Sequence, residues 1–324
     1  MRNSFRTILL MGAGILCLFS SCGKKQAVVS RPSFNSDSAY VYIEKQMSFG
    51  PRVPNSASHM RCAVWLIEQL RACGAEVELQ KGFMPDYRGN NQQIYNIIGH
   101  FGAANATRPR ILLGAHFDTR PWCDEEPEYS DRYYNVPGAN DGASGVGVLL
   151  EVARQLSLRD SLLTPVDIIF FDCEDMGTPH FFTGAEREDT WCLGSQLWAT
   201  NYVNKGAEVP YQYGLILDMV GAPDAIFPLE MYSTTYAANY QQQIWRSAEK
   251  LGYGAMFSNM QSYPITDDHY YINYIAGIPC VDVIHYDIRN ATGFASWWHT
   301  RNDDMSNISK STLQAVGEVV MSLL

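Results

Sequence analysis

The chain has 324 residues, of which 46% are hydrophobic and 18% are charged, and its formal net charge is −10. This length and composition are typical of one large α/β domain with a sizeable core, and they exclude an intrinsically disordered chain. The acidic balance and the lack of a basic stripe argue against nucleic acid as a partner.

The first 21 residues have the layout of a secretory signal peptide. Two arginines precede an apolar stretch at 8–19, and small residues lie before Cys22. The apolar stretch is short for a membrane-spanning helix of about 20 residues. Because the ending Leu-Phe-Ser-Ser-Cys resembles a bacterial lipoprotein cleavage box, we expect a lipid anchor on Cys22, a tether at 22–35 and a periplasm-facing location in the cell envelope. The alternative is a plain signal peptide with an incidental cysteine.

Helical and strand patterns alternate from residue 36 onward. In chain order the predicted elements are helices at 36–48 and 58–73, strands at 75–80, 94–102 and 110–118, a helix at 140–156, a strand at 166–175, a helix at 194–205, a strand at 213–221, a helix at 237–252, a strand at 275–284 and a helix at 311–324. This alternation predicts a three-layer α/β fold, with a mostly parallel twisted central sheet and helices on both faces. No linker follows residue 35, so residues 36–324 are expected to form one domain.

Acids and histidines follow almost every predicted strand. They are His116, Asp118, Asp172, Glu174, Asp175 and Asp218 near strand ends, Asp141 at a helix start, Asp267, Asp268 and His269 before the last strand, and His299 in a loop. In an open α/β sheet, ligands bind outside the carboxyl ends of the strands. Clustered carboxylates repel one another at such a rim, and oxygen and imidazole ligands suit zinc with one open coordination position. The pattern therefore predicts a zinc site.

Each of these residues, taken alone, has a simpler interpretation. Asp141 could cap a helix, His299 could be a surface histidine and Asp218 could form a turn. Glu174 could belong to a solvated acidic pair with Asp175. Acids or histidines at every strand end of one rim favour the metal site over these separate interpretations.

Five segments carry a resemblance to a known family. GAHFD, GANDGASGVGVLLEVAR, FFDCED, LDMVG and WWHT resemble, in this order, the metal-site blocks of the zinc aminopeptidase fold, peptidase family M28. More closely, they resemble the animal-type (type II) glutaminyl cyclases, which share that fold. The resemblance covers about residues 40–324. It implies one zinc ion per chain and conversion of the N-terminal glutamine of peptides or proteins to pyroglutamate, with release of ammonia.

The resemblance also implies a role for each site residue. These roles are zinc ligation by Asp141, Asp175 and His299, general acid–base catalysis by Glu174, and a hydrogen-bonded carboxylate chain beside it from Asp218 and Asp267. Trp298 would form a wall against the substrate glutamine. His116, a ligand of the second metal in the peptidases, would hold no metal here.

The chain departs from the animal enzymes at three places. Asp175 stands where they have a glutamate, so its side chain is one methylene shorter. Asp282 stands where they have a histidine near the pocket. The loop after Asp175 lacks their tryptophan, and we expect Trp191 to close the pocket instead.

Two other functions stay open. A zinc aminopeptidase would hold two metal ions and require His116, but these peptidases usually have serine at the position of Asp267, and Trp298 before the metal histidine favours the cyclase. A non-enzymatic, surface-anchored binding protein with a degenerate site is the third possibility. The presence of every expected ligand and acid argues against it. We expect a monomer.

Overall fold

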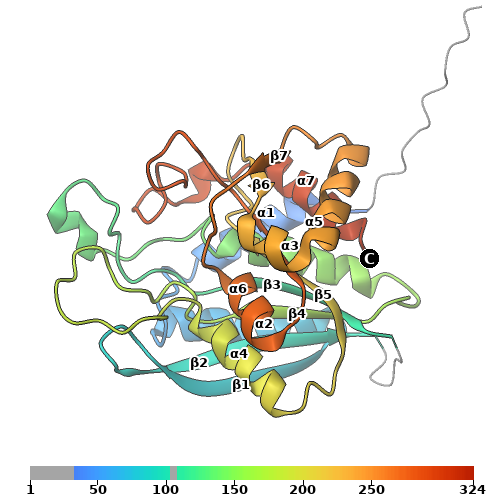
Figure 1. Cartoon of the computed structure of the whole chain (residues 1–324), viewed down its shortest axis with the longest axis horizontal. Coiled ribbons are helices and arrows are strands. Elements are labelled where there is room, and N and C mark those ends of the chain that lie inside the picture. The colour runs from blue at the N-terminus through green and yellow to red at the C-terminus, as the bar shows by residue number, and fades with distance from the viewer. Residues whose placement is uncertain (1–32, 103–107) are drawn as a thin grey trace, which may run out of the picture. The chain divides into compact units, whose positions relative to one another are not determined.

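The computed structural model describes residues 33–102 and 108–324, and it contains a central sheet of six strands in the order β1-β2-β4-β3-β5-β8 (Figure 1). The strands are β1 (Glu76–Pro85), β2 (Asn91–Phe101), β3 (Arg110–His116), β4 (Val166–Phe171), β5 (Tyr211–Asp218) and β8 (Cys280–Ile284). Strands β4, β3, β5 and β8 are parallel neighbours, whereas β2 runs antiparallel to both β1 and β4.

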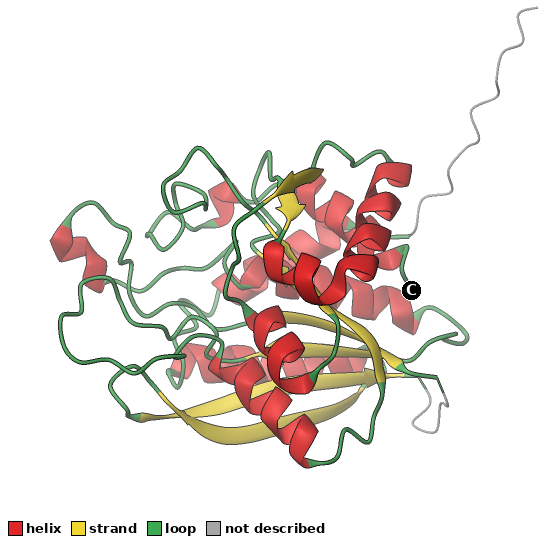
Figure 2. Cartoon of the chain, viewed as in Figure 1, coloured by secondary structure: helices red, strands yellow, loops and turns green. Residues whose placement is uncertain are grey.

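Helices cover both faces of this sheet (Figure 2). One face packs against α1 (Ser36–Met47), α2 (Ala57–Ala72), α3 (Ala143–Ser157), α5 (Met231–Leu251) and α7 (Lys310–Met321). The other face packs against α4 (Leu193–Asn204) and η2 (Ile272–Ala276), a π-helical turn that continues α6 (Asp268–Tyr271). Two short strands, β6 (Phe227–Leu229) and β7 (Phe257–Gln261), form a separate pair, and η1 (Tyr129–Tyr133) and η3 (Met305–Asn307) are 3₁₀ turns. This arrangement confirms the predicted three-layer fold.

The apolar run of β4 shows why both faces need cover. Ile168 and Phe170 point into the core beneath α3, while Ile169 and Phe171 point into the core beneath α4. Successive side chains of a strand alternate between faces, so a strand buried on both sides is apolar over most of its length. The one charged residue of β4, Asp167, is paired with His100 and Arg110. All six residues of β4 are buried.

The signal peptide predicted at 1–21 lies outside the described residues, as does the tether predicted at 22–35 except for its last three residues. Those three belong to the compact unit Arg31–Leu324. Phe34 is buried in the main core, and Asn35 caps α1. Within the described part of the chain, no helix is long and apolar enough to cross a membrane.

Most predicted elements lie within a few residues of the observed ones, with two differences. The strand predicted at 275–284 is wrong in its first half, because the chain there forms the π-helical turn and then reverses at Gly277, whose φ is +66°. Pro279 has no N–H to donate to a sheet, so β8 begins at Cys280. The helix predicted from 237 begins earlier, at Met231, and bends at Ala237, where φ is −134°.

The strand order creates a crevice at one rim of the sheet. β3 lies between β4 and β5. The connection after β3 therefore leads to the strand on one side, and the connection after β4 crosses back to the strand on the other side. Ligand sites of open α/β sheets lie at such points, outside the carboxyl ends of the strands. β3 ends at His116 and β5 ends at Asp218, which brings two predicted site residues to this rim.

The opposite end of the sheet offers a test of stability against pH. His100 Nδ1 on β2 lies 2.8 Å from Asp167 Oδ1 on β4, and this hydrogen bond raises the pKa of His100 above 6.5. A histidine whose pKa is raised by folding stabilises the native state fully below its unfolded pKa, about 6.5, and this stabilisation is lost as pH rises through the folded-state pKa.

We therefore expect His100→Gln to reduce the free energy of unfolding more at about pH 6 than at about pH 9. Urea unfolding of the wild type and the variant at both pH values measures the difference. An equal loss at the two pH values would contradict the expectation.

Candidate functional site

A cavity of about 460 Å³ opens at the carboxyl rim of the sheet. Its lining includes all eight residues that the sequence nominated for the site: Asp141, Glu174, Asp175, Trp191, Asp218, Asp267, Trp298 and His299. The structure thus brings together residues from six separate stretches of the chain.

Asp141, Asp175 and His299 form a compact set of potential metal ligands. His299 Nε2 lies 3.2 Å from Asp175 Oδ1 and 3.5 Å from Asp141 Oδ2. The ligand atoms of a tetrahedral metal ion with bonds of about 2.0–2.1 Å lie roughly 3.3 Å apart. The three side chains are therefore spaced as ligands of one ion.

The hydrogen bonding of Asp175 gives an independent test of this fit. Its Oδ2 is buried and has no hydrogen-bond partner among the described residues. A buried carboxylate oxygen without a partner is costly, and a bound cation removes that cost. The donor set and the unpaired oxygen therefore both fit a divalent cation held by Asp141, Asp175 and His299.

Asp141 is placed by the loop in front of α3. Gly142 adopts φ +87°, and a Cβ at this position would lie 2.9 Å from the carbonyl oxygen of Asp118, so only glycine fits. The Asp303 carboxylate accepts hydrogen bonds from the backbone N–H groups of Asn140 (2.8 Å) and Asp141 (3.0 Å). The simpler interpretation of Asp141 as a helix cap is wrong, because Gly142 is the N-cap of α3 and no side chain caps it.

Glu174 and Asp175 both reach the cavity because the chain turns directly after β4. Cys173 adopts a left-handed conformation, φ +56°, which ends the alternation of the strand. The Asp118 carboxylate then accepts the backbone N–H groups of Glu174 (3.1 Å) and Asp175 (3.3 Å). A left-handed residue other than glycine costs on the order of 1–3 kcal/mol and is common at functional sites.

Asp172 does not belong to the cavity, contrary to the expectation for strand-end acids. Its Oδ1 lies 2.8 Å from His59 Nε2 of α2, and its Oδ2 accepts the backbone N–H of Tyr95 at 2.8 Å. Asp172 is the last residue before the turn at Cys173, so its side chain still follows the alternation of β4 and faces away from Glu174 and Asp175.

His299 is held by a second layer of charge. Its Nδ1 lies 3.5 Å from Asp124 Oδ1, and Asp124 in turn accepts a hydrogen bond from Arg120 Nε at 2.7 Å. Carboxylates in this position orient metal-binding histidines and fix which ring nitrogen faces the metal. The sequence pattern gave no sign of Asp124 or Arg120, because both lie further along the loop after β3 and not directly at its end.

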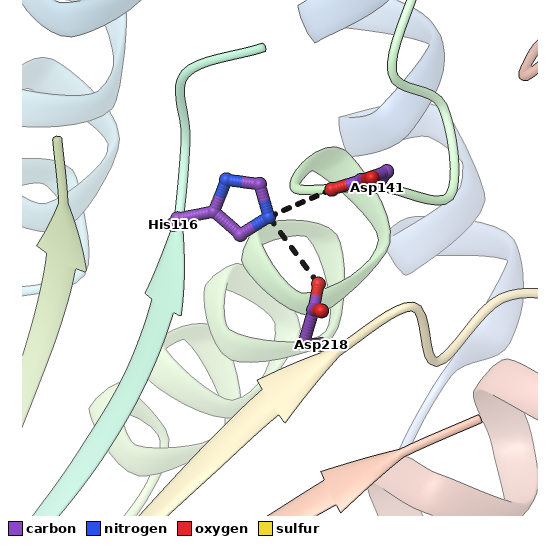
Figure 3. Close-up of side chains that lie close together, drawn as sticks. All are labelled: His116, Asp141 and Asp218. Atoms are coloured by element: carbon purple, nitrogen blue, oxygen red, sulfur yellow. Dashed lines mark hydrogen bonds and ion pairs between the residues drawn. The ribbon is translucent and has the colours of Figure 1, made fainter. Parts of the chain in front are cut away.

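A second group of potential ligands shares Asp141 with the first. His116 Nε2 lies 3.0 Å from Asp141 Oδ1 and 3.2 Å from Asp218 Oδ1 (Figure 3). Asp141 thus turns one oxygen to His116 and the other to His299. The geometry accommodates either one or two cations at this rim.

The predicted hydrogen-bonded chain of Glu174, Asp218 and Asp267 stays a prediction. Glu174 Oε1 accepts a hydrogen bond from Cys192 Sγ at 3.2 Å, and Asp218 Oδ1 lies 3.2 Å from His116 Nε2. Like-charged carboxylates stay apart unless they share a proton. A carboxylate oxygen of Asp267 nevertheless lies within 4.8 Å of Glu174 and Cys192.

Burial makes these acids hold protons more tightly. It raises the pKa of Glu174 well above its usual 4.5, and the charges of Asp175 and Asp267 add to this effect while His116 opposes it. Burial likewise raises the pKa of Asp218 to about 7. A carboxyl group with a raised pKa can both accept and donate a proton near neutral pH.

Aromatic side chains close the cavity. Trp298 stacks on the His299 ring with centroids 3.6 Å apart, and Phe294 packs on Trp298 at 4.6 Å. Trp191 also lines the cavity and lies parallel to the His299 ring, with centroids 6.2 Å apart; that it closes the pocket stays a prediction. The apolar lining that the sequence did not reveal comes from Met219, Ile265, Ile284, Tyr286 and Phe294.

Replacing Asp124 tests the layer behind His299. We expect Asp124→Asn to weaken zinc binding about ten- to a hundredfold, because the neutral side chain orients His299 less firmly. Competition with a chelator of known affinity measures the change.

The matched control is Asp167→Asn. Asp167 is also a buried aspartate bonded to an arginine and near a histidine, but it lies at the opposite end of the sheet. An equal loss of zinc affinity in both variants would contradict the role given to Asp124.

Solved structures with similar folds carry two different names. A glutaminyl cyclase from Tannerella forsythia is 44% identical, with a TM-score of 0.85, and the match covers 90% of this chain and 98% of that one. A Zn-dependent exopeptidase from Parabacteroides distasonis is also 44% identical with a TM-score of 0.85, over 91% of this chain and 99% of that one.

Sequence comparison points to the same group of proteins. The glutaminyl-peptide cyclotransferase of Boiga irregularis is 24% identical over 243 residues, which are 65% of this chain and 60% of that protein, so the chain spans about three fifths of the length of this relative. The sequence model of peptidase family M28 matches residues 96–324, which contain all eight nominated site residues. The chain belongs to peptidase family M28.

Proposed function

We propose that this protein is a zinc-dependent glutaminyl-peptide cyclotransferase that converts the N-terminal glutamine of peptides or proteins to pyroglutamate and releases ammonia. The observation on which the proposal rests is the position of Asp267. One of its carboxylate oxygens lies within 4.8 Å of a carboxylate oxygen of Glu174, and both residues line the cavity that contains the candidate metal ligands. Similarity to solved glutaminyl cyclases over nine tenths of the chain supports it.

The reaction joins two groups of one molecule. The α-amine nitrogen of the substrate attacks its own γ-carbonyl carbon, a C–N bond forms, and the bond to the amide nitrogen breaks as ammonia leaves. Both groups belong to one molecule, so the cavity has only to hold them in a reactive orientation; well-oriented intramolecular reactions gain on the order of 7–11 kcal/mol in the best cases. Trp298 and Phe294 form a wall that can orient the glutamine side chain.

The residues of the chain move the proton that this reaction requires. Glu174 is placed to accept a proton from the attacking amine and to return it to the departing nitrogen. Asp267 and Asp175 raise its pKa by their charge, in addition to the larger effect of burial. Zinc held by Asp141, Asp175 and His299 would polarise the γ-carbonyl.

A zinc aminopeptidase is the second candidate function, and one observation favours it. His116, Asp141 and Asp218 form an intact second ligand set beside the first. A peptidase of this fold would use two ions, so the number of metal ions per chain and the product formed distinguish the two functions.

We expect the wild type to form pyroglutamate from glutamine-initiated peptides with about one zinc per chain, and Glu174→Gln to lower kcat at least about a hundredfold because the proton carrier is lost. Ammonia release, aminoacyl-amide hydrolysis and metal content are measured on the same sample. Hydrolysis without pyroglutamate, with two metal ions per chain, would establish the peptidase instead.

We also propose that Cys22 carries a lipid and holds a monomeric domain at the membrane of the bacterial cell envelope. The resemblance of the sequence before Cys22 to a bacterial lipoprotein cleavage box supports this proposal. Metabolic labelling with a fatty acid should mark the wild type but not Cys22→Ser, and label that persists in the variant would contradict the anchor.

A further inference from the structure

Glu230 is a fully buried acid at the start of α5 that accepts five hydrogen bonds. Its Oε1 accepts the backbone N–H groups of Tyr232 (2.8 Å) and Ile265 (3.1 Å). Its Oε2 accepts the N–H (2.6 Å) and the hydroxyl (2.8 Å) of Ser233 and lies 3.0 Å from His269 Nε2. One carboxylate therefore joins three segments of the chain.

One of these segments lines the active-site cavity. Ile265 lines the cavity wall, and Asp267, two residues further on, lies beside Glu174. The hydrogen bond from Ile265 to Glu230 is thus a direct attachment of the wall to a buried anchor. Ile265 is only partly buried, so the wall depends on such attachments more than a core segment would.

His269 lies between Glu230 and Asp267; it is within hydrogen-bond distance of Glu230 and in charge contact, without a hydrogen bond, with Asp267. With Nε2 directed at Glu230, its Nδ1 lies 3.6 Å from Asp282 Oδ2 and 3.9 Å from Asp267 Oδ2. Among the residues the structure describes, His269 is the one basic side chain within 4.0 Å of either acid. Burial opposes a charge on His269, yet Asp282, Asp267 and Glu230 together raise its pKa well above 6.5.

We propose that Glu230 is a positioning residue of the active site: it holds His269 against Asp267 and, through a separate oxygen, fixes the cavity wall at Ile265. This inference rests on the proposed function of the site. Glu230 itself touches neither the cavity nor the candidate metal ligands, so it acts only through the groups that it holds.

Glutamine at this position cannot replace both functions of the carboxylate. It has the same shape, but it presents an NH₂ donor in place of one oxygen. If the NH₂ faces His269, it meets the Ser233 N–H, and if it faces Ile265, it meets the Tyr232 N–H. Either orientation leaves donors opposed to donors, which is costly in a buried site.

The test is a double-mutant cycle on the holoenzyme with Glu230→Gln, His269→Gln and the double variant. We expect each single change to lower kcat about ten- to a hundredfold, as for other residues that orient a reacting group. The double variant should lose no more than the worse single variant, because both changes act on kcat through the position of Asp267. KM should rise in Glu230→Gln but not in His269→Gln, since only Glu230 holds the wall.

Asn35→Ala is the matched control for a merely structural role. Asn35 also caps a helix by accepting two backbone N–H groups, but it lies at the start of α1, away from the cavity. It should lower the melting temperature and leave kcat and KM unchanged. Glu230→Gln behaving in the same way, or losses that multiply in the double variant, would overturn the proposal.

Two further measurements separate this proposal from the proposed function. If the wild type hydrolyses aminoacyl amides and forms no pyroglutamate, the proposed cyclase function is wrong. The double-mutant cycle is then measured with the rate of aminoacyl-amide hydrolysis. A crystal structure of Glu230→Gln tests the positioning without any assay. Displaced Asp267 and Ile265 would support it, and both side chains in their wild-type places would overturn it.

Discussion

The crowding of buried carboxylates at one rim of the sheet is the constraint on which the rest of this structure depends. Asp141, Glu174, Asp175, Asp218 and Asp267 are each at most 8% exposed. Charges so close together and so poorly solvated cannot all be ionised without a nearby positive charge. His116 and His299 supply part of that charge, raised pKa values of Glu174 and Asp218 remove another part, and the unpaired oxygen of Asp175 leaves a place for a cation.

At the opposite rim of the same sheet, a buried carboxylate has its hydrogen-bond partners within the protein. Asp167 is as deeply buried as the acids of the cavity, but Arg110, His100 and the Tyr211 hydroxyl all bond to it. Nothing is left for a ligand to complete. The two rims differ in the supply of donors and not in burial, which is why burial alone does not identify a binding site.

The fold could be predicted from sequence because its determinants are local. The apolar runs of β3 and β4 and the helical spacing of α3 indicate their secondary structure without tertiary information. The strand predicted at 275–284 failed where a π-helical turn, stabilised by Asn273 side-chain bonds to the backbone of His269 and Cys280, replaced the expected extended chain. That interaction depends on packing that no local pattern encodes.

The site was predictable to the same degree and for the same reason. Asp141, Glu174, Asp175 and Asp218 follow strands or a glycine loop, so their position in the sequence reveals their rim, whereas the roles of Asp267 and His299 were predicted from the family resemblance. The sequence around Asp124, Cys192 and Glu230 does not indicate that they contact site residues. Each contacts its partner (His299, Glu174 and His269, respectively) from a loop or a helix start, through contacts between residues far apart in the sequence. Asp172 was misplaced for the converse reason: it follows a strand, but the turn comes one residue later.

That turn at Cys173 has a consequence for anyone who would rebuild this chemistry elsewhere. On a regular strand, neighbouring acids point to opposite faces, so writing Glu-Asp onto the end of another sheet would deliver one carboxylate to a pocket and bury the other in the core. The left-handed residue and the pair of N–H groups that Asp118 receives are what make the two neighbours share one side. A graft would have to carry the bend and its acceptor along with the acids.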